Sequence, residues 1–97
     1  MREIKIGNKK IGQKNPCYTI AEAGANHEGD LKKAFKLIDA AVYSKADSIK
    51  FQTYTASKLV TKTAPKYWDD GIKGETQFDV FSKLDTLKKS DWQEIFN

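Results

Sequence analysis

The sequence predicts an α/β fold in which a β-hairpin is followed by a strand, a helix and a second strand that runs parallel to the first. One observation is the alternation of apolar and polar residues on both sides of a Gly7-Asn8 turn. Another is a pair of short apolar runs, at residues 17–21 and 48–53, separated by a segment whose apolar residues recur every three or four positions. Two strands of one sheet that are joined through a helix run parallel.

The hairpin is predicted over residues 1–12, because glycine and asparagine tolerate the positive backbone angles of a tight turn. Asn15-Pro16 then breaks the alternating pattern. We therefore assign residues 1–14 to the hairpin unit and residues 15–97 to the first βα units of the fold.

The βα unit is predicted to begin with a strand at residues 17–21. This run is rich in β-branched and aromatic residues and carries little charge, which suits a strand buried on both faces. A loop at residues 22–29 ends it, and Asp30 stands where the N-cap of a helix belongs. The helix, predicted from about residue 30 to residue 44, has one apolar stripe formed by Leu31, Ala34, Phe35, Ile38, Ala41 and Val42.

The second half of the chain is predicted to contain a long loop and two further helices. Residues 54–73 are polar and indicate a loop with a helical turn, and long loops in compact domains often carry function. The run Ser90-Asp91-Trp92-Gln93 indicates a capping box that opens the last helix. The helix before it, over residues 75–84, has three large apolar residues in register: Phe78, Phe81 and Leu84.

Composition indicates one small soluble domain. Of the 97 residues, 39% are hydrophobic and 31% are charged, and the mean hydropathy is −0.65. The sequence has no apolar run long enough to span a membrane and no apolar core behind its charged N-terminus, so a cytoplasmic chain without a membrane partner is expected. The single cysteine, Cys17, excludes an internal disulfide and a zinc finger.

The net charge of +4 does not indicate nucleic-acid binding. The basic residues are sixteen lysines and Arg2, and acidic residues are interspersed among them. Reading of a nucleic-acid sequence relies on bidentate arginine and on clustered positive charge. No nucleic-acid partner is expected.

The predicted sheet is too small to be stable alone. Parallel strands are normally buried on both faces within larger sheets. The sequence is therefore expected to be the first part of a larger α/β protein, and a (β/α)8 barrel of about 250 residues would accommodate it.

Three polar residues are predicted at the carboxyl edge of the sheet, where α/β proteins place their working residues. Glu22 follows the first strand, and Lys50 and Gln52 lie near the end of the second. Side chains alternate along a strand, so Lys50 and Gln52 share one face, and Ile49 and Phe51 face the helices. Lys50 and Gln52 are therefore expected to point into the interior of the barrel, where an unpaired lysine is costly, so Lys50 must be paired or must bind an anion. A Glu22–Lys50 ion pair that only fills the interior and a substrate site both remain open.

The loop after the first strand has a weaker case for function. Its glycines are explained by turns alone, and the Asn26 side chain by hydrogen bonds to the loop backbone. His27 is more simply a hydrogen-bonded loop histidine than a metal ligand, because a metal site needs further ligands.

Two segments together resemble the N-terminal part of the sialic acid synthases, which make N-acetylneuraminate, its 9-phosphate and related nonulosonic acids such as legionaminic acid. The first is Ala-Glu-Ala-Gly-Ala-Asn-His-Glu-Gly at residues 21–29, and the second is Lys-Phe-Gln-Thr at residues 50–53. The similarity extends through residues 37–41, 57–62 and 64–66, and so covers nearly the whole chain.

The resemblance implies the N-terminal part of a TIM barrel whose hairpin closes the bottom. It also implies a transferase that forms a carbon–carbon bond between phosphoenolpyruvate and an N-acetylmannosamine-type sugar. The resemblance further implies a divalent metal, Mn²⁺ or Mg²⁺, whose histidine ligands lie beyond Asn97. The C-terminal antifreeze-like domain of the family also lies beyond Asn97. Family members of full length form homodimers.

The resemblance also implies roles for individual residues. The glutamate matching Glu22 faces the sugar, the lysine matching Lys50 contacts phosphoenolpyruvate, and the glutamine matching Gln52 lies on the sugar side. Glu22 and Lys50 are thus the expected catalytic residues, and Lys50, Gln52 and Asn26 the expected substrate-binding residues. One departure is Lys45, where the family usually has the glycine that a left-handed helix end favours.

Two alternatives to a synthase are carried forward. A Schiff-base aldolase of the same architecture would use Lys50 as an amine nucleophile. A non-catalytic fragment would have no activity of its own. The acceptor sugar, and whether it is phosphorylated, is left open.

Overall fold

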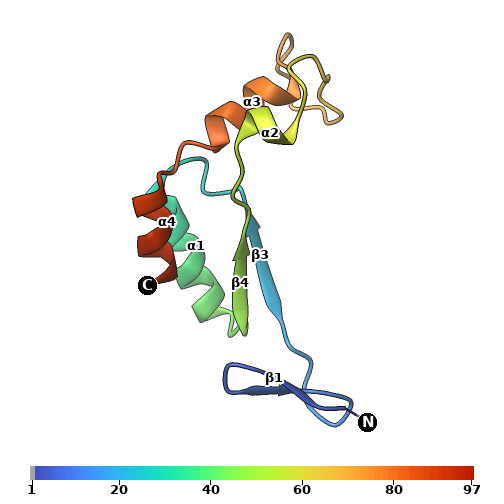
Figure 1. Cartoon of the computed structure of the whole chain (residues 1–97), viewed down its shortest axis with the longest axis vertical. Coiled ribbons are helices and arrows are strands. Elements are labelled where there is room, and N and C mark those ends of the chain that lie inside the picture. The colour runs from blue at the N-terminus through green and yellow to red at the C-terminus, as the bar shows by residue number, and fades with distance from the viewer. Residues whose placement is uncertain (1) are drawn as a thin grey trace.

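The computed structural model describes residues 2–97. Its elements follow in the order β1 (Ile4–Ile6), β2 (Lys9–Ile11), β3 (Ile20–Gly24), α1 (Leu31–Tyr43), β4 (Ser48–Phe51), α2 (Ala56–Leu59), α3 (Gln77–Leu84) and α4 (Lys89–Phe96). Figure 1 shows an elongated arrangement, with the β1–β2 hairpin at one end, the β3–β4 pair in the middle and α2 and α3 at the other end. None of the helices within residues 2–97 is both long and apolar enough to cross a membrane.

The hairpin forms as predicted. β1 pairs antiparallel with β2, with Ile4 opposite Ile11. Gly7 adopts the positive φ of +57° that the turn requires. An ion pair of 3.3 Å between the Lys9 ammonium and the Asp47 carboxylate ties the hairpin to the turn before β4.

The parallel pair of strands is also confirmed, from Ile20 opposite Ser48 to Gly24 opposite Phe51. The first strand begins three residues later than predicted, however, and continues to Gly24. Thr19 does not join the ladder because it bonds the turn before β4: its N–H donates to the Asp47 carboxylate at 2.8 Å. Glu22 therefore lies within the strand and not in the loop after it.

The predicted burial of this strand on both faces is wrong for the described residues. The side chain of Ile20 is 59% exposed, because α1 covers only one face of the two-stranded sheet. The hydrophobic side chains that are buried within residues 2–97 are all alanines: Ala23, Ala34, Ala41 and Ala56. The structure confirms an α/β fold, and two parallel strands by themselves do not show a barrel.

The helix α1 has the predicted cap and nearly the predicted bounds. The Asp30 carboxylate accepts a hydrogen bond of 2.8 Å from the Lys32 N–H and so satisfies one of the free N–H groups of the first turn. Ala34 and Ala41 are buried, whereas Phe35 and Val42 of the predicted stripe remain exposed. Lys45 takes the left-handed conformation after the helix, with φ of +62°, without the glycine that this position favours.

The last helices differ from prediction in where they begin. The predicted helical turn in the long loop is α2, and α3 begins at Gln77 because Thr76 caps it: the Thr76 hydroxyl accepts from the Asp79 N–H at 3.3 Å. The capping box predicted at Ser90 is wrong. The Asp91 carboxylate accepts from the Lys88 N–H at 2.8 Å, which makes Lys88 the N-cap of α4.

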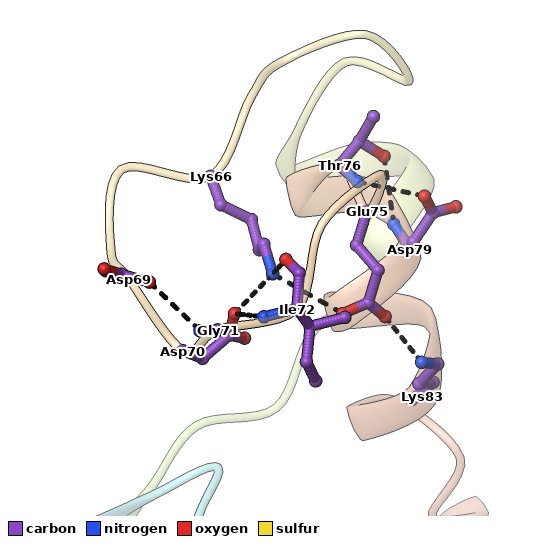
Figure 2. Close-up of polar contacts among 9 residues, drawn as sticks. All are labelled: Lys66, Asp69, Asp70, Gly71, Ile72, Glu75, Thr76, Asp79 and Lys83. Carbon is purple, nitrogen blue, oxygen red and sulfur yellow. Dashed lines mark hydrogen bonds and ion pairs between the residues drawn. The ribbon is translucent and has the colours of Figure 1, made fainter.

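The segment between α2 and α3 closes into a compact loop, residues 64–77. Pro65 and Thr76 form a β-bridge, and the Gln77 side-chain amide donates to the Pro65 carbonyl at 2.8 Å. Inside the loop, Figure 2 shows the Lys66 ammonium between three oxygens. These belong to the Asp70 carboxylate at 2.7 Å, the Ile72 carbonyl at 2.9 Å and the Glu75 carboxylate at 3.5 Å.

Candidate functional site

An ion pair joins the two parallel strands near their carboxyl ends. Glu22 of β3 stands opposite Lys50 of β4, and the Lys50 ammonium lies 3.0 Å from the Glu22 carboxylate. Both side chains are about half exposed, at 57% for Lys50 and 54% for Glu22, because they lie on the sheet face that the described helices leave open. The pair is therefore accessible to a ligand.

The opposite face of β4 packs against helices, as predicted. Ile49 lines a small space between the sheet and α1 together with Leu37 and Ala41. The Phe51 ring lies 5.9 Å from the Trp92 ring of α4, with the two planes tilted by 72°. The predicted division of β4 into a polar face and a helix-facing apolar face is confirmed.

Gln52 joins the pair at the same edge. Its backbone N–H donates to the Gly24 carbonyl at 3.0 Å, which extends the ladder one residue beyond β4. A β-carbon placed on Gly24 would lie 3.3 Å from a Glu22 carboxylate oxygen and 3.5 Å from the Gln52 amide oxygen. The heads of Glu22 and Gln52 thus approach a common point, and the structure brings Glu22, Lys50 and Gln52 together.

A β-bulge lies within this site. The register passes from Glu22 opposite Lys50 to Gly24 opposite Phe51, so Ala23 is an extra residue on β3. Bulges bend a strand and change the direction of its side chains, and they are frequent beside active sites. Here the bulge ends β3 and sends the chain into the turn that contains Asn26.

Asn26 is held by its backbone. Its N–H donates to the Ala23 carbonyl at 2.9 Å, and the residue is exposed. The hydrogen bonds found among residues 2–97 do not tie its side chain to Glu22, Lys50 or Gln52. Its role in substrate binding stays a prediction from the resemblance.

His27 is the largest fully buried side chain in the described part of the chain, with 1% exposure. Its Nδ1 accepts a hydrogen bond of 2.9 Å from the Gly29 N–H, which places the ring proton on Nε2. The ring meets Trp92 edge to face, with centroids 5.6 Å apart. Burial lowers the pKa of His27, so the ring is neutral at pH 7. The Nδ1 bond agrees with a hydrogen-bonded loop histidine, whereas Nε2 is buried without a hydrogen-bond partner among the described residues.

No metal site is assembled from the residues described. Within 2–97 the structure gathers no group of three or more His, Cys, Asp or Glu side chains that could hold a metal ion. The divalent metal stays an expectation from the resemblance, which puts its ligands beyond Asn97.

A cavity beyond the end of β4 was not anticipated from the sequence. It has a volume of about 430 Å³ and lies between residues 52–55 and α4. The Tyr54 hydroxyl is buried near it without a hydrogen-bond partner, and burial together with the Asp85 charge raises the pKa of Tyr54. The only hint in the sequence was an aromatic residue with a polar head directly after the second strand.

The fold and the polar cluster define a protein built from βα units with charged side chains at the carboxyl edge of its parallel strands. Known proteins identify the family. The family model described as NeuB family matches residues 37–97, which is more than half of the chain. The chain belongs to the NeuB family.

Individual relatives cover the N-terminal segment too. The spore coat polysaccharide biosynthesis protein SpsE of Bacillus subtilis is 45% identical over 88% of this chain and 23% of its own length. The N,N'-diacetyllegionaminic acid synthase of Legionella pneumophila is 42% identical over 89% of this chain and 25% of its own length. This chain thus spans about a quarter of the length of these curated relatives.

A solved structure shows the same arrangement. The N-acetylneuraminic acid (sialic acid) synthetase from Leptospira borgpetersenii, in complex with citrate, superposes with a TM-score of 0.70 at 37% sequence identity. The match covers 97% of this chain and 29% of the synthetase chain.

Proposed function

We propose that the full-length protein carrying this segment condenses phosphoenolpyruvate with an N-acetylmannosamine-type sugar to form a sialic, or nonulosonic, acid. The observation that supports this most directly is the Glu22–Lys50 pair at the carboxyl edge of a NeuB-family βα unit. The names of the relatives agree with it, since they include synthases of legionaminic, pseudaminic and N-acetylneuraminic acids. β3 and β4 would then be the first two strands of a TIM barrel, the hairpin would close its bottom, and the enzyme would be a homodimer.

The reaction forms one carbon–carbon bond and releases phosphate. The methylene carbon of phosphoenolpyruvate bonds to the aldehyde carbon of the open-chain sugar, and the aldehyde oxygen takes up a proton to become a hydroxyl. Water adds to the former enol carbon. That carbon then expels phosphate by cleavage of its carbon–oxygen bond, which leaves a 2-keto acid.

Lys50 is suited to hold the anionic substrate. Its ammonium can bind the phosphate or carboxylate of phosphoenolpyruvate, and a cation fixed in place also stabilises negative charge that develops during the reaction. In the free chain the Lys50 ammonium forms an ion pair of 3.0 Å with the Glu22 carboxylate. When phosphoenolpyruvate shares Lys50, Glu22 can accept a hydrogen bond from a sugar hydroxyl, and Gln52 can contact the sugar beside it.

The aldolase alternative is less well supported by the geometry. An imine-forming lysine needs a neutral amine, which desolvation or a neighbouring cation provides. Lys50 is more than half exposed and lies beside a carboxylate. Borohydride added with substrate should therefore leave no covalent adduct on the full-length enzyme, and a reduced adduct on Lys50 would establish the aldolase instead.

Replacement of the Lys50 cation tests the proposal directly. Lys50→Met keeps the side-chain stem and removes the charge, so the KM for phosphoenolpyruvate should rise by about tenfold or more, as expected for the loss of a hydrogen bond to a charged group. Lys36→Met on the outer side of α1 is the matched control and should leave KM unchanged. An unaltered dependence of rate on phosphoenolpyruvate concentration in a folded Lys50→Met enzyme would refute the role of Lys50.

A further inference from the structure

Gly24 occupies an unusual place in the candidate site. It is buried, it ends β3 directly after the bulge, and its φ of +54° lies in the left-handed region. Its carbonyl accepts the Gln52 N–H at 3.0 Å. The backbone at this point is thus fixed on both strands, and a residue without a β-carbon adopts its conformation at the lowest cost.

Conformation alone does not account for the environment of Gly24. Gly7, Gly71 and Gly74 also have positive φ angles, of +57°, +75° and +84°, but a β-carbon on any of them would meet nothing within 4 Å. A β-carbon on Gly24 would meet a Glu22 carboxylate oxygen at 3.3 Å and the Gln52 amide oxygen at 3.5 Å. The bare α-carbon of Gly24 therefore lies directly beneath the heads of two polar side chains.

We propose that Gly24 is a positioning residue for the acceptor sugar, and that its bare α-carbon forms the floor of the acceptor subsite between Glu22 and Gln52. This inference rests on the proposed function. A carboxylate accepts hydrogen bonds from sugar hydroxyls, and an amide can both accept and donate, so the two heads suit a neutral polyhydroxylated ligand. The Lys50 ammonium, on the far side of Glu22, suits the anionic substrate.

The arrangement separates the effects on the two substrates. A side chain at position 24 has Glu22 and Gln52 as its nearest neighbours, so it must displace the groups assigned to the sugar or fill the space between them. The cation assigned to phosphoenolpyruvate belongs to Lys50, whose partner atom is the other carboxylate oxygen of Glu22. Substitution of Gly24 should therefore raise the KM for the acceptor sugar far more than the KM for phosphoenolpyruvate.

The test uses the full-length enzyme with Gly24→Asn and Gly24→Ala. Among residues with a side chain, asparagine is one of those that best tolerate positive φ, so Gly24→Asn adds a side chain to the site with limited backbone strain. The matched controls are Gly7→Asn and Gly7→Ala, because Gly7 has nearly the same φ and open space around it. We expect Gly24→Asn to raise the KM for N-acetylmannosamine by about tenfold or more, with the KM for phosphoenolpyruvate within about twofold and the Gly7 variants unchanged.

A double-mutant cycle with Gln52→Ala separates positioning from a general loss of structure. If Gly24 acts through Gln52, Gly24→Ala should cost less in the Gln52→Ala background than in the natural sequence, whereas Gly7→Ala should cost the same in both. Additive effects in the cycle, or equal increases in the KM of both substrates, would overturn the role of Gly24. A natural-sequence enzyme that does not condense the two substrates would instead refute the proposed function.

Discussion

At the scale of single residues, His27 shows how burial determines the state of a side chain. Its Nδ1 accepts the Gly29 N–H, and its ring is enclosed by Phe51 and Trp92. A proton on Nδ1 would remove that acceptor and bury a charge among apolar rings. The pKa of His27 is accordingly lowered from its ordinary value of 6.5.

This state predicts acid sensitivity. Because the pKa of His27 is lower in the folded protein than in the unfolded chain, the unfolded chain binds more protons below about pH 6.5. The contribution of a neutral His27 is complete above that pH and is lost as the pH falls through the folded-state pKa. In the full-length protein, His27→Asn keeps an acceptor for the Gly29 N–H and cannot be protonated. It should flatten the pH dependence of the unfolding free energy in urea, and an unchanged slope would contradict this.

The polar residues of the site could be predicted individually, but their common floor could not. The rule of the carboxyl edge is sufficient to place Glu22, Lys50 and Gln52 at one edge of the sheet, and alternation along the strand puts Lys50 and Gln52 on one face. The bulge at Ala23 has no signature in a run of small residues, because it depends on how β3 pairs with β4. Without the bulge, the sequence explains Gly24 by a turn and gives no sign that its α-carbon lies beside Glu22 and Gln52.

At the scale of elements, the loop of residues 64–77 is held by an internal cation. The Lys66 side chain is only 8% exposed, and Asp70 raises the pKa of Lys66, while Lys66 in turn lowers the pKa of Asp70. Lys83 lowers the pKa of Glu75 from the outer side of the loop, through an ion pair of 2.6 Å. The Lys66 ammonium thus links three oxygens of the loop, in addition to the bridge between Pro65 and Thr76.

Removal of that ammonium should open the loop. Lys66→Met leaves Asp70 and Glu75 facing each other's charge and removes the donor that the Ile72 carbonyl accepts from. We expect backbone amides of residues 64–77 to exchange with solvent about tenfold faster or more in the full-length protein. Lys73→Met, at an exposed lysine of the same loop, is the control and should not change the exchange. Equal protection in both variants would show that the bridge between Pro65 and Thr76 is sufficient.

The elements themselves were predicted well and their ends less well. The periodicity of α1 and the order of strand, helix and strand depend on local pattern, which the sequence contains. The ends depend on particular hydrogen bonds. The Thr19 N–H donates to Asp47, and β3 begins only at Ile20. The Lys88 N–H donates to Asp91, and α4 begins at Lys89. A competing local pattern at Ser90 favoured the wrong cap.

At the scale of the whole molecule, residues 2–97 are more extended than a compact domain. The radius of gyration is 16.9 Å, whereas a compact chain of this length has about 12.5 Å. The accessible surface is 7797 Å², compared with about 5,600 Å² for a folded monomer of this mass. The excess includes large apolar side chains on several different elements, namely Ile20, Val42, Tyr43 and Phe96.

These surfaces predict how residues 1–97 behave when produced alone. Within residues 2–97, β3 and β4 each keep one unpaired edge, the face that carries Glu22 and Lys50 is about half exposed, and the buried apolar side chains are alanines. Apolar burial and the entropy cost of folding nearly cancel even in complete small domains, so this chain should be a loosely folded or aggregating species without condensation activity. Calorimetry and analytical ultracentrifugation should show a broad, non-cooperative transition and no stable compact monomer. A sharp cooperative melt of a monomer would contradict the expected loose folding. Condensation activity from residues 1–97 alone would contradict the expectation that the active site needs further strands of the proposed barrel.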